Sequence, residues 1–149
     1  MYSVYSTYDE GTAMDVLHYA SASDARAHLK DLLDAAHGGR VATVDRDSER
    51  VAVVDATRLR DALAALTDAR AEVLFEEGEW AAFLPGLPVH AVSNTLDGAV
   101  DELIIGLRQY AFDWTARLRS APNHTENWGV VQLIGLSTDA QLRDWINAA

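Results

Sequence analysis

Two cations near the start of a predicted helix form the first candidate site for chemistry. Ser23 can cap this helix, Arg26 follows it by about one turn, and Lys30 lies four residues later on the same helical face. Backbone amides at a helix N-terminus and nearby cations together suit a phosphate group. The same spacing fits an ordinary solvated face on which Arg26 pairs with Asp24 or Asp31, so both interpretations stay open.

An acidic turn is the second candidate site. Glu76, Glu77 and Glu79 lie close together, directly before Trp80. A solvated hairpin tip would explain the cluster. The functional alternative is a contact surface for a basic protein, with Trp80 as a buried anchor. Trp128 follows a Pro-Asn loop, and we assign it to the same kind of interface.

Nothing in the sequence predicts catalysis, a metal site or a cofactor. The five histidines show no pair at metal-ligand spacing with a third ligand nearby, and the chain has no cysteine. The phosphate-binding Gly-x-Gly-x-x-Gly and Walker motifs and the Gly-x-Ser-x-Gly nucleophile motif are also missing. We therefore expect a protein that is not an enzyme and that needs no cofactor.

The charge of the chain separates its two halves. The 149 residues are 49% hydrophobic and carry a formal net charge of −11, which argues against nonspecific binding to nucleic acid. Residues 1–70 hold 8 basic and 12 acidic residues, and residues 71–149 hold 4 and 11. Any phosphate contact therefore belongs to the first half. The acidic second half suits a basic partner, although an acidic surface is also a common means of solubility. No apolar run is long enough for a membrane span and no export signal opens the chain, so we expect a cytoplasmic protein without a membrane partner.

The first half predicts a β-α-β-β-α module over residues 14–70, after an irregular tail at residues 1–13. A strand at 15–19 precedes a helix that starts at Ser23 and ends at Gly38-Gly39, where glycine accepts the left-handed cap conformation. Strands at 41–44 and 51–54 flank a polar turn, and Asp55 can cap a second helix to about residue 68.

The second half predicts a β-β-β-α-β-α module over residues 71–149. Strands are expected at 72–75, 80–84 and 89–93, and Thr95 can cap a long helix to about residue 118. The apolar residues 129–136 predict a fourth strand, and Ser137 or Thr138 can cap a last helix. The predicted fold class is α/β (α+β) with two modules.

Residues 21–29 read Ser-Ala-Ser-Asp-Ala-Arg-Ala-His-Leu at the start of a glycine-ended helix, and a strand pair ending at Asp55 follows. Residues 14–68 thereby resemble the Phd/YefM antitoxin family, with Asp24 in place of the usual glutamate. The resemblance implies DNA binding by Arg26 and Arg46, which match the two DNA-contacting arginines of that family. Because one module offers only two or three such cations, a homodimer on a palindromic site is expected.

Residues 72–108 resemble the HicB module of antitoxins. The matching features are a strand, a strand led by Trp80 that runs into Pro85-Gly86-Leu87-Pro88, and a helix start at Thr95-Leu96. The sequence departs from the family pattern after Pro88, where Val89-His90 replaces the usual Gly-Cys. The resemblance implies a module that contacts a toxin.

The sequence thus leads to the hypothesis of a type II antitoxin that neutralises a small basic toxin of the RNase type and represses its own operon as a homodimer or higher oligomer. The residues expected to bind operator DNA are Ser23, Arg26, Lys30 and Arg46. Those expected to bind toxin are Glu76, Glu77, Glu79, Trp80 and Trp128. A stand-alone transcriptional regulator whose second module senses a small molecule or another protein is the alternative. A second half that only dimerises is the third possibility.

Overall fold

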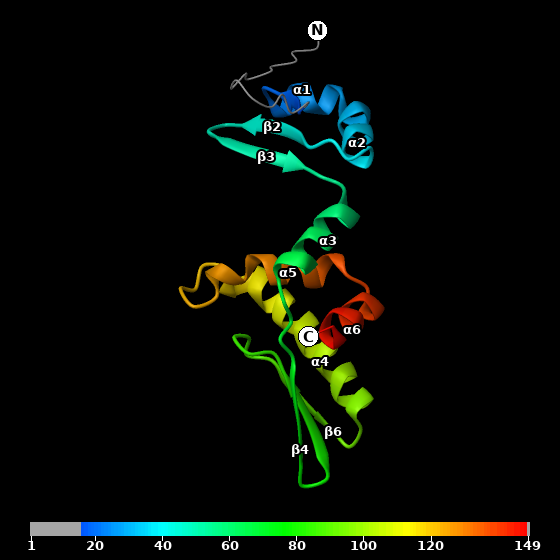
Figure 1. Cartoon of the computed structure of the whole chain (residues 1–149). Helices are drawn as coiled ribbons and strands as arrows, with labels where there is room; N and C mark the ends of the chain where they lie inside the picture. Colours follow the sequence, from blue (N-terminus) through cyan, green and yellow to red (C-terminus); the bar gives the residue numbers. More distant parts are fainter. Residues whose placement is uncertain (1–15, 149) are drawn as a thin grey trace, which may run out of the picture. The chain divides into compact units, whose positions relative to one another are not determined.

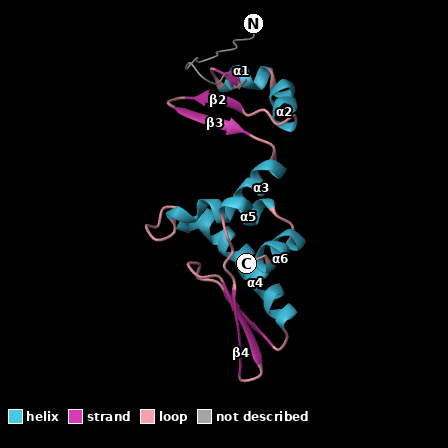
Figure 2. Cartoon of the chain, viewed as in Figure 1, coloured by secondary structure: helices cyan, strands magenta, loops and turns pink. Residues whose placement is uncertain are grey.

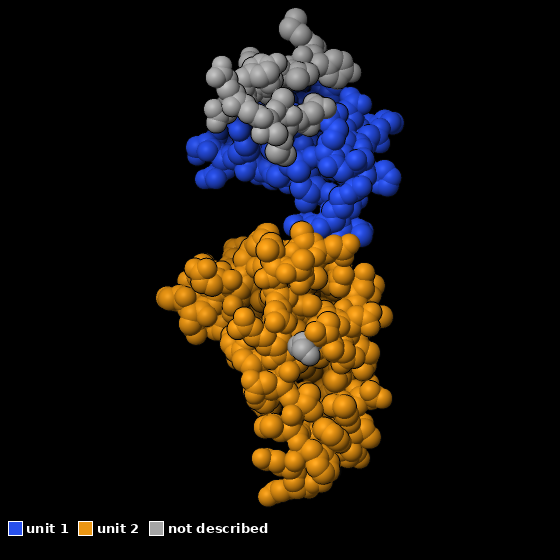
Figure 3. Space-filling view, viewed as in Figure 1, with its two compact units in different colours: residues 1–59 blue, residues 60–149 orange. Residues whose placement is uncertain are grey.

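The computed structural model describes residues 16–148, which contain six α-helices and two three-stranded sheets (Figure 1; Figure 2). Backbone contacts divide the described chain into two compact units between Leu59 and Arg60, inside helix α3 (Ala56–Leu66) (Figure 3). The tail predicted at residues 1–13 lies outside the described residues. The functional boundary expected after residue 70 stays a prediction. The mixed α+β fold class is confirmed.

The first unit is built on strands β1 (Leu17–Tyr19), β2 (Ala42–Arg46) and β3 (Glu49–Val53). The sheet has the order β1-β2-β3, in which β1 runs parallel to β2 and β3 antiparallel to it. Helices α1 (Ala22–Ala27) and α2 (Leu29–His37) connect β1 to β2. The buried residues of this small core are Tyr19, Ala25, Leu32 and Ala42.

The predicted first helix is wrong in two respects. Its N-cap is Ser21 rather than Ser23, because the Ser21 hydroxyl accepts a hydrogen bond from the Asp24 amide at 3.1 Å. It is also two helices, which meet at His28 with φ −121°. The His28 ring makes a hydrogen bond with the Asp24 carbonyl and stacks on Tyr19 at 5.6 Å, which favours a break in the helix at this point.

This break changes which side chains are buried. In α2, Leu29 and Leu33 are 53% and 52% exposed, while Leu32 is buried. The helix does end at the predicted glycines, where Gly39 has φ +89°. The hairpin turn is shorter than predicted, because β2 and β3 pair down to Arg46 and Glu49.

The second unit begins with an antiparallel meander of β4 (Glu72–Glu76), β5 (Glu79–Phe83) and β6 (His90–Ser93). Helix α4 (Leu96–Asp113) packs against β5 and β6 and continues into a π-helical turn, η1 (Trp114–Leu118). A short 3-10 turn, η2 (Thr125–Asn127), leads to α5 (Trp128–Leu136) and α6 (Asp139–Asn147), which both pack against α4. The largest fully buried side chains are Leu103, Leu107, Leu133, Ile134 and Leu142.

The strand predicted at residues 129–136 is wrong, because these residues form α5. A short run that is apolar on nearly every side fits a buried strand and a buried helix equally well. Val130, Val131, Leu133 and Ile134 are buried at helical spacing. The second module is therefore β-β-β-α-α-α. The predicted helix starts at Thr95 and Thr138 are confirmed, and Gln141 completes a capping box with Thr138.

Candidate functional site

The predicted DNA-binding residues lie on neighbouring elements of the first unit. Arg26 is in the last turn of α1, Lys30 in the first turn of α2, and Arg46 at the end of β2. All three are exposed, as is Ser23, which lies inside α1 instead of capping it. The expected phosphate site at a helix N-terminus is therefore not formed around Ser23 and Arg26. Arg26 and Lys30 also belong to two helices instead of one helical face.

These cations differ in how they are paired. Lys30 forms an ion pair with Asp34, which raises the pKa of the lysine. Within residues 16–148, the side chains of Arg26 and Arg46 have neither a hydrogen bond nor an ion pair. An exposed arginine that no carboxylate holds is free to bind a phosphate without first giving up a partner. The structure therefore favours Arg26 and Arg46 over Lys30 as phosphate ligands.

A nearby arginine is already engaged by its own hairpin. Arg50 donates to both carboxylate oxygens of Asp45, with Nε to Oδ1 at 2.8 Å. This hydrogen-bonded pairing is the main cause that lowers the pKa of Asp45. His18 contacts the same carboxylate through Nε2 at 3.3 Å and makes a hydrogen bond with Thr43 through Nδ1. The polar cluster joins all three strands of the sheet and is structural.

The predicted acidic turn forms the tip of the β4–β5 hairpin. Glu76 and Glu79 pair across the two strands, and Glu77 and Gly78 occupy the turn with φ of 53° and 85°. Two positive φ values are typical of the tight turns that connect hairpin strands. All three glutamates are exposed, so their charge is available to a partner.

The structure adds an apolar surface beside this tip that the sequence did not single out as a site. Three consecutive side chains of β4 are exposed, Val73 by 40%, Leu74 by 49% and Phe75 by 57%. We call this surface the β4 edge. Trp80 is half-buried and packs on Phe75 with ring centroids 4.9 Å apart. The sequence feature that could have indicated this surface is the run of three apolar residues between Glu72 and Glu76, directly before a tight turn.

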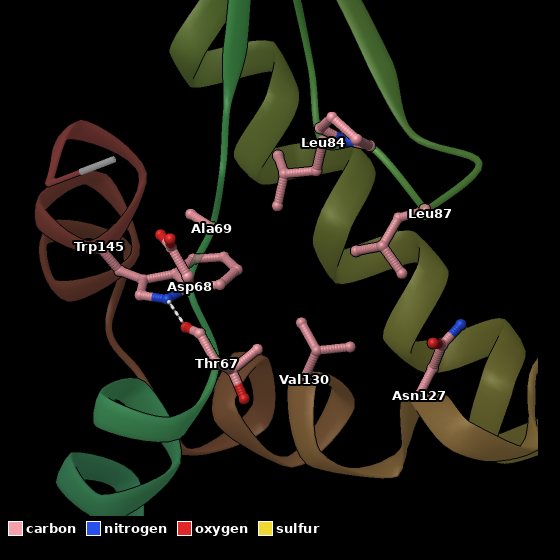
Figure 4. A pocket seen from close by; sticks show the side chains of 10 residues that line it. Thr67, Asp68, Ala69, Leu84, Leu87, Asn127, Val130 and Trp145 are labelled. Atoms are coloured by element: carbon pink, nitrogen blue, oxygen red, sulfur yellow. Dashed lines mark hydrogen bonds between the residues drawn. The ribbon is translucent and has the colours of Figure 1, made fainter.

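A cavity of about 180 Å³ lies in the second unit at the Pro-Gly-Leu-Pro motif (Figure 4). Leu84 and Leu87 enter it from the loop after β5, and Val130 enters from α5. The indole of Trp145 closes the opposite side and donates a hydrogen bond to the Thr67 carbonyl at 2.7 Å. The motif therefore shapes an apolar wall, which sequence reasoning did not foresee.

The remaining tryptophans fall into two groups. Trp114 and Trp145 are each 8% exposed and hydrogen-bonded through their indole nitrogens, as core residues are. Trp128 is 52% exposed at the first position of α5 and has no such bond among the described residues. Its exposure leaves it available for the interface to which the sequence assigned it.

A polar cluster surrounds His124 in the second unit. The Tyr110 hydroxyl makes a hydrogen bond with His124 Nδ1 at 2.9 Å and accepts one from Asn127 at 2.7 Å.

Within residues 16–148, no three histidine, aspartate or glutamate side chains are grouped as a metal site would require. None of the helices in that range combines the length and apolar character needed to cross a bilayer.

Comparison with known proteins adds one finding. No family model and no curated protein matches the sequence. A crystal structure from Syntrophomonas wolfei subsp. wolfei, the antitoxin part of a proposed toxin/antitoxin system, matches with a TM-score of 0.74 and 18% sequence identity. The match covers 85% of this chain and 94% of that one. The two chains share one fold. Because the match covers 85% of this chain, more than either unit contains, the likeness extends over both units.

Proposed function

We propose that this protein is the antitoxin of a type II toxin–antitoxin system. The observation that carries the proposal is the fold shared with the Syntrophomonas wolfei antitoxin over 94% of that chain. An antitoxin acts by binding and needs no catalytic group. The two surfaces described above have opposite chemistry, which suits two different partners.

The first unit supplies the DNA-binding function in this proposal. Arg26 and Arg46 would contact operator phosphates, with a smaller contribution from Lys30 because it is paired with Asp34. Two free arginines per chain hold DNA weakly, so a homodimer is required. Leu29 and Leu33 on α2, together with Val51 at 51% exposure on β3, provide apolar surface for that dimer.

The second unit supplies the toxin-binding function. Glu76, Glu77 and Glu79 would attract a basic toxin, and Trp80 or Trp128 would anchor it. Charges at the rim of a protein–protein interface govern mainly the association rate, and buried aromatic side chains govern mainly the dissociation rate. RNA-cleaving toxins bind a polyanion, so a basic toxin of the RNase type is the partner that fits this charge.

Co-expression with the product of the adjacent gene tests the proposal. The expected result is a stable complex, rescue of growth when that product is toxic, and repression of a reporter fused to the upstream DNA. A product that neither binds this chain nor slows growth would contradict the proposal.

One observation favours a second candidate function, that of a regulator which senses a small molecule. A cavity of about 400 Å³ in the second unit lies within the size range of ligand pockets. Its polar lining includes His90, Tyr110, Arg117 and His124. Release of the upstream DNA by a small metabolite, without any protein partner, would support this function over the antitoxin.

A further inference from the structure

Among residues 16–148, strand β4 is hydrogen-bonded to β5, and no described strand pairs with its other side, which we call the open side. In an antiparallel ladder, successive residues alternate between pointing their backbone groups toward the partner strand and away from it. The pair that flanks a two-residue turn, here Glu76 and Glu79, is hydrogen-bonded. Val73 and Phe75 therefore direct their N–H and C=O groups outward, toward the open side.

The three central side chains of β4 are apolar and are divided between the two faces of the sheet, with Glu72 and Glu76 on the face of Leu74. Val73 and Phe75 lie on the face of Ala82 and Trp80, and Leu74 lies on the opposite face beside Ala81. Each of the three is at least 40% exposed. A further strand added to β4 would place side chains over both faces at once, and a helix docked on one face would leave the other exposed.

Soluble proteins usually protect such edges with lysine, proline or a bulge. The β4 strand, Glu-Val-Leu-Phe-Glu, has no lysine or proline, and its pairing with β5 is continuous over all five residues. Its protection against other chains rests on the glutamates at its two ends. An edge of this kind is suited to a partner whose charge complements those glutamates.

The same glutamates argue against a second copy of this chain as the occupant. Antiparallel pairing of two β4 strands centred on Leu74 would place Glu72 of one copy opposite Glu76 of the other, twice per dimer. Like charges directly opposite each other destabilise a sheet. A basic strand would gain two favourable pairs at the same positions.

We propose that β4 binds an extended strand of a basic partner protein, which continues the sheet through the outward groups of Val73 and Phe75. The inference rests on the proposed function, in which that partner is the toxin. The acidic tip would then steer the toxin toward the edge, and the backbone of β4 would hold it. This mode of recognition is strand addition to a sheet edge.

Hydrogen exchange on the full chain tests the pairing directly, with the adjacent gene product as the probe. The amides of Val73 and Phe75 should exchange at least tenfold more slowly in the complex than in the free chain. A complex in which these amides exchange as before would overturn the inference and leave the antitoxin proposal intact. Failure of the wild-type chain to bind the product would instead contradict the antitoxin proposal itself.

A matched pair of variants separates backbone pairing from side-chain burial. Val73→Pro removes the outward N–H without removing a bond to β5, a position where sheets tolerate proline. Val73→Ser removes the same apolar side chain and keeps the N–H. We expect Val73→Pro to bind the product at least tenfold more weakly than Val73→Ser, with equal melting temperatures. Equal binding by the two variants would refute strand addition.

A charge reversal tests the choice of occupant. Glu72→Lys would turn both opposed glutamate pairs of a β4–β4 dimer into attractive pairs. We expect this variant to bind the product at least tenfold more weakly and to self-associate in sedimentation experiments. Protection of Val73 and Phe75 in the wild-type chain alone, rising with its concentration, would show that a second copy occupies the edge and would overturn the proposal.

Discussion

Removal of the two unpaired arginines of the first unit tests how an acidic protein could hold DNA. Arg26 and Arg46 are exposed and have no carboxylate partner within residues 16–148, so replacing them by alanine removes no hydrogen bond or ion pair of the described residues. We expect the double variant Arg26→Ala/Arg46→Ala to keep the melting temperature of the wild type and to lose detectable binding to the upstream DNA at physiological salt.

The magnitude follows from counterion release. Each neutralised phosphate contributes about 0.9 to the slope of log affinity against log salt concentration, so two arginines in each chain of a dimer contribute roughly 3.6. Between 50 and 200 mM salt this slope corresponds to a change in affinity of about a hundredfold. The variant should therefore show a much flatter salt dependence where its binding is still measurable, at low salt.

Fluorescence anisotropy with the DNA upstream of the gene, at several salt concentrations, measures both quantities. Arg117→Ala/Arg119→Ala is the matched control, because it removes two exposed cations from the second unit. The control should bind with the wild-type slope. If both double variants lower the slope of log affinity against log salt equally, DNA binding depends only on the net charge of the protein, and the assignment of Arg26 and Arg46 is wrong.

Three further perturbations concern stability. The side chain of Leu107 has no exposed surface, so Leu107→Ala should lower the free energy of unfolding of the second unit by about 2–5 kcal/mol. Urea titrations measure this loss, and a value below about 1 kcal/mol would contradict the tight packing of α4. Thr138→Ala should cost about 1 kcal/mol, because the capping box with Gln141 is lost, and an unchanged urea midpoint would show that the cap contributes nothing. Asp45→Asn should lower the melting temperature only where Asp45 is ionised. Arg50 lowers the pKa of this carboxyl from its ordinary 3.8, so the stabilisation is present above that pH and is lost as pH falls through the lower folded value. A difference that does not depend on pH would refute the pairing.

The sequence predicted those parts of the fold that local chemistry determines. Thr95 and Thr138 cap helices because a threonine hydroxyl can accept a bond from a first-turn amide, wherever the helix then packs. The break at His28 was not predictable in this way, because it coincides with stacking on Tyr19, a contact between elements. Helix α5 was missed for a related reason, since only its burial against α4 distinguishes it from a strand.

The candidate sites show the same limit. The sequence identified the exposed arginines and the acidic tip by residue type. It could not show that Arg26 would lie in the last turn of α1, because that depends on the break at His28. It also predicted a strand at Val73–Phe75 without showing that this strand lies at an edge, since edge position depends on how β5 and β6 are ordered.

The glutamates that flank β4 have a consequence for the colloidal stability of the isolated protein. Exposed apolar strands nucleate intermolecular sheets unless charged gatekeeper residues keep copies apart. Here the gatekeepers are Glu72 and Glu76, and their repulsion acts through solvent because both are exposed. The screening length falls from about 10 Å at 0.1 M salt to about 3 Å at 1 M. High salt concentrations prevent the association of many proteins. At this edge they instead screen the repulsion between the glutamates of different copies, so dilute buffers are the better storage condition for the free chain.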